Sequence, residues 1–154
     1  MAKKKRRWFW YVLLGLIIII QFIPGEKPKI STDNKDDLLK NNEIPATVAD
    51  ILRKSCYDCH SNETRYPWYS RVSPVKFLVY HDIEEGREHL NFSNWQSMKK
   101  IERATALDEI STVITTGEMP MKLYTKMHSE AKLDDSKKKE MSQWAEAFAE
   151  KIFE

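Results

Sequence analysis

The stretch KSCYDCHSNETRYPWY, residues 54–69, contains both cysteines of this 154-residue chain. Cys56 and Cys59 are separated by two residues, and His60 follows the second cysteine directly. A thioredoxin-like redox pair would need a βαβ context, which the sequence does not show. A zinc site would need a fourth ligand and usually a second cysteine pair. If the chain is exported from the cytoplasm, the two cysteines could instead form a disulfide.

The remaining interpretation is C-x-x-C-H, the attachment motif of c-type haem. Residues at positions i and i+3 of a helical turn face the same way, so Cys56 and Cys59 can form thioethers to two vinyl groups on one porphyrin edge. His60 would then lie under the ring and bind the iron. The chain has one such motif, so the sequence predicts one covalent haem c, held by Cys56, Cys59 and His60.

A haem iron that only carries electrons usually has a second axial ligand. Met119, in TTGEMPMKLY, lies about 60 residues after His60, as is typical of class I cytochromes c. Gly117 should end a helix and Pro120 should stiffen the loop. We expect Met119 to be the sixth ligand, with Met121, His128, an open site and core packing of the methionines as alternatives.

Hydrophobic periodicity predicts an all-α domain with four amphipathic helices. They are expected over residues 44–56, with Pro45 in the first turn; over 74–90; from Asn94, with a break at 105–108; and after Asp134. The residues expected to face inward are Val48, Ile51, Leu52, Ser55, Val75, Leu78, Val79, Ile83, Trp95, Met98, Ile101, Ile110, Val113, Ile114, Met141, Trp144, Ala145, Phe148 and Ile152.

The N-terminus predicts one transmembrane helix. Residues 1–7 form a basic tail, and residues 8–23 contain no charge. A cleaved signal peptide would need small residues at its exit, which QFIPGEKPK lacks, and a buried helix fits poorly beside such charge. The basic tail would stay in the cytoplasm, which predicts an inner-membrane, single-pass protein with its haem domain on the periplasmic or outer face. Residues 24–43 are expected to be a polar tether and residues 44–154 the haem-binding domain.

The remainder of the chain is mildly acidic. Removing the five basic residues of the tail leaves 20 of the 25 Lys and Arg against 23 Asp and Glu, which is a net charge of −3. This balance argues against a nucleic-acid partner.

The segments CYDCHSNETRYPWYSRVSP, HDIEEGREHLNFSNW and GEMPMKLYTKMHSEAKLDDSKKKEMSQWAE resemble the small membrane-anchored haem-binding domain family of cytochrome c-like proteins. The resemblance covers residues 44–146. It implies a helical, class I cytochrome c-like domain and c-type haem bound through Cys56, Cys59 and His60. It does not specify a substrate, and Ser129 departs from a common His-Pro pattern.

Electron transfer with an unidentified redox partner protein is therefore the expected function. A haem sensor, small-ligand binder or weak peroxidase would need an open sixth site, and an accessory subunit is a third possibility. No acid–base constellation is evident, so a carrier is favoured over an enzyme. Tyr66, Trp68 and Tyr69 are expected against the haem or in the core, and Arg87 beside a propionate or in solvent.

Overall fold

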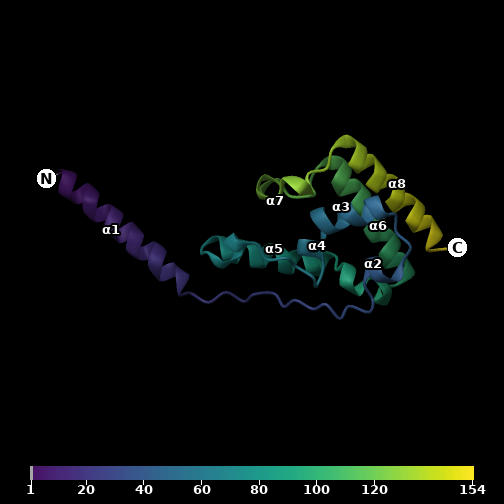
Figure 1. Ribbon diagram of the computed structural model, residues 1–154, viewed down its shortest axis with the longest axis horizontal. Helices are drawn as coiled ribbons and strands as arrows, with labels where there is room; N and C mark the ends of the chain where they lie inside the picture. Colours follow the sequence, from purple (N-terminus) through teal and green to yellow (C-terminus); the bar gives the residue numbers. More distant parts are fainter. Residues whose placement is uncertain (1) are drawn as a thin grey trace.

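All regular structure in residues 2–154, which the computed structural model describes, is helical (Figure 1). This confirms the prediction of an all-α chain. The α-helices are α1 (Ala2–Gln21), α2 (Leu38–Asn41), α3 (Ala46–Ser55), α4 (Tyr57–His60), α5 (Val75–His89), α6 (Lys100–Thr116), α7 (Lys122–Met127) and α8 (Asp135–Lys151). Three short 3₁₀ helices lie between them: η1 (Trp68–Arg71), η2 (Phe92–Ser97) and η3 (Ser129–Ala131).

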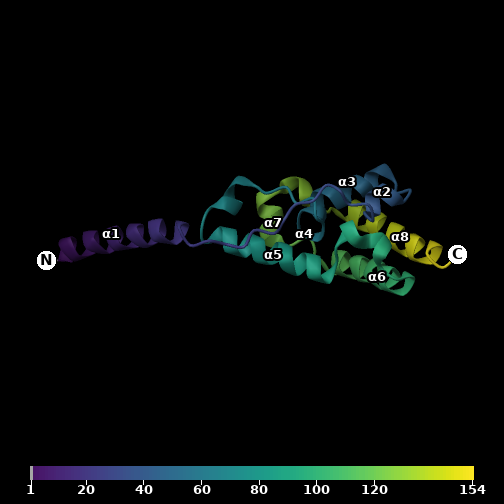
Figure 2. The ribbon, with the colours of Figure 1, turned by 90° about the horizontal axis from the view of Figure 1, so that it is seen from below.

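The core lies where α8 packs against both α6 and α3 (Figure 2). Leu52 of α3, Leu107 of α6 and Met141 of α8 are fully buried there. Each such side chain contributes about 1.5–3 kcal/mol by leaving water. Val48, Ile51, Leu52 and Ser55 of α3 are all buried, as the sequence predicts.

Two of the predicted helix ends are confirmed. Asp134 accepts a hydrogen bond from the backbone of Lys137 at 2.9 Å and so caps α8. Gly117 follows α6 with φ of 77°, in the left-handed region that favours glycine.

The prediction of a helix that starts at Asn94 and breaks at 105–108 is wrong. Asn94 lies inside η2, and α6 begins only at Lys100. The carboxylate of Glu102 accepts a hydrogen bond from the backbone of Lys99 at 2.9 Å, which satisfies a free donor at the helix start. The helix continues through 105–108 because Leu107 is fully buried in the core.

The predicted inner stripe of α5 is only partly buried. Ile83 is buried, but Val75 and Leu78 are 40% and 44% exposed. Both of these side chains line a cavity, described below, instead of the core.

α1 extends away from the rest of the chain (Figures 1 and 2). Among residues 2–154, none of the helices combines the length and the apolar character needed to cross a bilayer. The predicted anchor at 8–23, and the inner-membrane placement that depends on it, are therefore wrong. Basic residues occupy the first turns of α1, and its uncharged part, 8–21, is about 21 Å long against a hydrocarbon core of about 30 Å.

Residues 24–37, expected to be part of a tether, run along the domain (Figure 1). The carbonyl of Pro28 accepts a hydrogen bond from the Tyr66 hydroxyl at 2.7 Å. The carbonyl of Lys29 accepts one from Arg87 at 2.9 Å. Leu38, which directly follows this segment as the first residue of α2, is fully buried. The segment thus contributes to the surface beside the C-x-x-C-H turn.

Candidate functional site

The C-x-x-C-H residues form a tight turn at the junction of α3 and α4. The carbonyl of Cys56 accepts hydrogen bonds from the backbone of Cys59 at 3.1 Å and of His60 at 2.9 Å. Cys56 and Cys59 are free thiols, and both line one cavity together with His60. The local helical turn therefore presents two sulfurs and an imidazole to the same space.

The orientation of the His60 ring is set by the backbone of Leu90. Its Nδ1 lies 3.0 Å from the carbonyl oxygen of Leu90. A carbonyl only accepts, so Nδ1 carries the proton and Nε2 keeps its lone pair. Burial lowers the pKa of His60, which favours the neutral ring. A neutral imidazole fixed through its other nitrogen is the usual form of a metal-binding histidine.

Burial also keeps both thiols protonated in the absence of a bound group. It raises the pKa of Cys56 to about 12, with a smaller contribution from neighbouring Cys59. It raises the pKa of Cys59 to about 11, with further contributions from Asp58 and Asp82. At neutral pH both are neutral thiols, so neither suits a hydrated cation without deprotonation.

Gly86 allows α5 to lie directly against the cysteine turn. A Cβ added there would lie 3.0 Å from the carbonyl oxygen of Cys59 and 3.2 Å from its Cβ. These contacts are tighter than ordinary van der Waals contacts, so any larger residue would require α5 or the cysteine turn to shift. This is a residue that the sequence analysis missed, because nothing in the local pattern of α5 shows what packs against it.

The cavity beside His60 has a volume of about 440 Å³, within the usual range for small-molecule sites. Its apolar wall is formed by side chains from α6, from the residue after α5 and from the start of η2: Leu90, Phe92, Ala106, Ile110, Val113 and Ile114. Met119 and Met121 complete it. The charged wall residues are all acidic: Asp58, Asp82, Glu85, Glu109 and Glu118.

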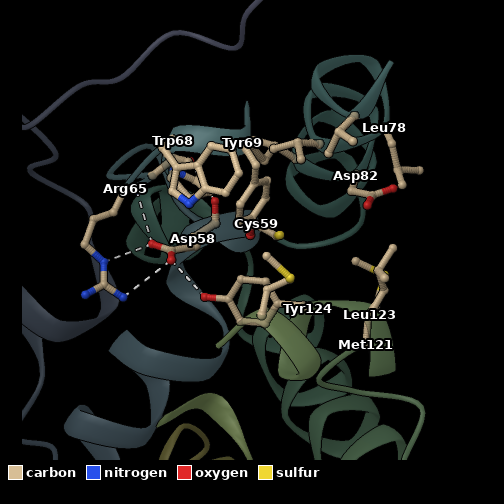
Figure 3. A pocket seen from close by; sticks show the side chains of 16 residues that line it. Asp58, Cys59, Arg65, Trp68, Tyr69, Leu78, Asp82, Met121, Leu123 and Tyr124 are labelled. Carbon is tan, nitrogen blue, oxygen red and sulfur yellow. Dashed lines mark hydrogen bonds and ion pairs between the residues drawn. The ribbon is translucent and has the colours of Figure 1, made fainter. Parts of the chain in front are cut away.

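A second cavity has a volume of about 400 Å³, and Figure 3 shows the side chains that line it. The two share Asp58, Cys59, Asp82, Met121 and Tyr124 as wall residues. The second is almost entirely apolar, and Val75, Leu78 and Val79 of α5 line it. The exposed stripe of α5 is therefore the wall of an apolar space that begins at Cys59.

The candidate sixth ligands lie in different surroundings. Met119 lines the cavity of His60, is 37% exposed, and is held by a backbone hydrogen bond to Val113 at 3.1 Å. Met121 lines both cavities and immediately precedes α7. His128 lines neither cavity.

Both ring nitrogens of His128 already have hydrogen-bond partners. Its Nε2 lies 2.7 Å from the Tyr69 hydroxyl, and its Nδ1 lies 3.2 Å from Glu130. His128 is thus engaged in a structural network.

The other predicted contacts have mostly structural roles. Arg87 donates to the carbonyl of Ser61 at 2.8 Å and to the hydroxyl of Thr64 at 3.0 Å. Arg87 therefore connects α5 by hydrogen bonds to residues 61–64, the loop that follows the cysteine turn. Trp68 and Tyr69 line the second cavity, with Trp68 75% exposed.

These residues fit a flat, apolar cofactor with an iron centre. The two cysteine thiols lie on one turn, and the imidazole of His60 has a free nitrogen. The thioether side chains of Met119 and Met121 line the same cavity. The absence of a side chain at Gly86 leaves room for α5 beside Cys59. Fold and site together define a small all-helical protein of the haem-binding class.

Comparison with known proteins agrees. The profile of a family described as "Haem-binding domain" matches residues 15–147, and the chain belongs to this family. The prediction of a haem-binding family, and of haem as the cofactor, is thereby confirmed.

One curated relative shows weak similarity. The chain is 22% identical over 134 residues to cytochrome c peroxidase Ccp of Escherichia coli (strain K12). The match covers 85% of this chain but only 28% of that protein. No solved structure matches the chain.

Proposed function

We propose that the chain is a monohaem c-type protein that carries single electrons. Cys56 and Cys59 would hold the haem through thioether bonds, and His60 Nε2 would bind its iron. The observation that supports this most is the cavity wall itself, where two free thiols and an imidazole with Nε2 unprotonated meet in the order C-x-x-C-H.

Met119 is the proposed ligand on the other side. It shares a cavity with His60, and Gly117 and a backbone hydrogen bond to Val113 fix the loop that carries it. When bound, haem supplies one-electron exchange at iron, and a thioether ligand favours the ferrous state and a higher potential. The apolar wall side chains would limit the access of water to the iron, and the hydrogen bond from His60 Nδ1 to the carbonyl of Leu90 would fix the imidazole and tune its strength as a ligand.

A redox partner protein is part of the proposal. The partial exposure of Met119 brings the edge of the site near the surface, where electrons can be exchanged. Carriers need such an edge, whereas a catalyst needs acid–base groups aimed at a substrate.

The test of covalent attachment is a haem stain on a denaturing gel. Protein produced in a host that attaches c-type haem should keep its stain after boiling in detergent. The Cys56→Ala/Cys59→Ala double variant should lose it. If the unaltered protein releases its haem on denaturation, the thioether proposal is overturned.

A second function, a small-ligand binder or weak peroxidase, is favoured by the exposure of Met119 and by the peroxidase relative. Carbon monoxide distinguishes the two. An electron carrier with firm methionine ligation should bind it slowly as the ferrous protein. Fast, complete binding would favour the second function.

A further inference from the structure

Asp58 lies between the two cysteines, and its carboxylate accepts hydrogen bonds from both Arg65 and Tyr124 (Figure 3). Its side chain is 11% exposed. Oδ1 accepts hydrogen bonds from the backbone of Arg65 at 3.2 Å and from its Nε at 3.1 Å. Oδ2 accepts from the Tyr124 hydroxyl at 2.8 Å and lies 3.4 Å from Arg65 Nη2. Arg65 thus fixes the carboxylate, which is the nearer acceptor of the Tyr124 hydroxyl. The same hydroxyl also lies 3.3 Å from the carbonyl oxygen of Lys54 in α3.

Tyr124 belongs to α7, a helix that apolar packing does little to fix. None of its six residues is fully buried. The hydrogen bonds made by its side chains are therefore important for the position of α7. The Tyr124 ring also stacks on His128, with ring centroids 4.4 Å apart, and His128 is bonded to Tyr69.

The loop that carries Met119 and Met121, residues 117–121 (the methionine loop), leads directly into this helix. Met121 immediately precedes α7, and its carbonyl accepts a hydrogen bond from Thr125 at 3.0 Å. A movement of α7 would therefore move Met121 as well. It would also displace Met119, which lies two residues before Met121 in the chain. At the other end, Asp58 is covalently part of the turn that holds Cys56, Cys59 and His60.

We propose that Asp58 and Tyr124 are positioning residues for the sixth ligand. Their hydrogen bond holds the methionine loop against the cysteine turn and so sets how firmly Met119 covers the iron. This inference rests on the proposed c-type ligation. It assigns a role to the second variable residue of C-x-x-C-H that the motif itself does not require.

The direct test is Tyr124→Phe in the haem-loaded protein. The substitution keeps the ring and removes only the hydroxyl. A hydrogen bond to a buried carboxylate is strong enough that its loss should raise the rate of carbon monoxide binding to the ferrous protein by about tenfold or more. The thioether-to-iron charge-transfer band of the ferric protein should weaken in parallel. Tyr66→Phe is the matched control, because it removes a hydroxyl bonded at 2.7 Å to Pro28, away from the methionine loop.

A double-variant cycle separates positioning from general loosening. In a Met119→Ala background the sixth position is already open, so adding Tyr124→Phe should leave the carbon monoxide rate unchanged. The inference is overturned if Tyr124→Phe behaves like the unaltered protein, if Tyr66→Phe has the same effect, or if the two substitutions act additively. If the unaltered protein lacks the charge-transfer band and binds carbon monoxide at once, the proposed Met119 ligation fails, and the positioning role fails with it.

Discussion

Met119 and Met121 are two residues apart and both reach the cavity of His60, so the choice between them is made at the scale of one side chain. We expect Met119→Ala to abolish the charge-transfer band, lower the reduction potential and open the iron to carbon monoxide, because the thioether that favours ferrous iron is lost. Visible spectra and a redox titration measure these changes. Met121→Ala is the control and should do little. The reverse pattern would assign the ligand to Met121 and leave electron transfer intact.

Gly86 provides a second test at single-residue scale. We expect Gly86→Ala to destabilise the haem-free protein by about 1–3 kcal/mol, because the new Cβ would contact backbone and cannot be accommodated by a rotamer change. Urea unfolding measures this. Gly15→Ala is a matched control, since a Cβ there has nothing within 4 Å and alanine favours the helix by about 1 kcal/mol. Equal effects of the two substitutions would contradict the close approach of α5 to Cys59.

At the scale of helices, burial separates core elements from elements that line the cavities. We expect Leu107→Ala to reduce the free energy of unfolding of the haem-free protein by about 2–5 kcal/mol, because it leaves a cavity between packed helices. Leu78→Ala should cost less than about 1 kcal/mol, because Leu78 is 44% exposed and loses few contacts. Urea unfolding of both haem-free variants checks this. A large loss for Leu78→Ala would mean that α5 belongs to the core.

The same distinction explains which helices could be predicted from the sequence. The face of α3 and the end of α6 at Gly117 follow from local patterns, because periodicity and glycine conformation are local properties. The apolar stripe of α5 has the same sequence pattern whether it faces a core or lines a cavity. The start of α6 depends on Glu102 bonding back to Lys99, although an Asn at 94 is the stronger statistical cap.

In the candidate site, too, the local features could be predicted from the sequence and the contacts between distant elements could not. Cys56, Cys59 and His60 are adjacent in sequence, so their spacing alone suggests their chemistry. The contributions of Gly86, Leu90 and Tyr124 arise only when separate helices meet, and no spacing encodes them. The N-terminal helix shows the converse, because an uncharged apolar run beside a basic tail predicts a membrane span, whereas the helix that forms lacks the length and apolar character to supply one.

At the scale of the whole molecule, the first residues of the chain are basic and the rest of the chain is mildly acidic. The basic residues 3–7 lie in α1, whereas residues 8–154 carry a net charge of −3. The cavity of His60 has only acidic residues among its charged wall residues within the described chain, and Glu85, Glu109 and Glu118 are exposed. The surface around the site should therefore have a negative potential.

This potential should govern electron exchange with small charged reagents. At low ionic strength a cationic metal complex should oxidise or reduce the protein faster than an anionic one of similar driving force, with an electrostatic effect of about tenfold or more. Salt should slow the cation and speed the anion, because the Debye length falls to about 8 Å at physiological ionic strength. Stopped-flow kinetics over a salt series measures both trends.

The position of the charges, as well as their sum, decides the result. The triple variant Glu85→Gln/Glu109→Gln/Glu118→Gln should lose most of the salt dependence, because it neutralises the rim of the cavity. The control Glu146→Gln/Glu150→Gln/Glu154→Gln makes the same change in net charge on exposed residues of α8 and the C-terminus, none of them in the cavity wall. It should keep the salt dependence. If both triple variants respond alike, electrons do not leave through this face of the molecule, and the exposed edge at Met119 is not the route of exchange.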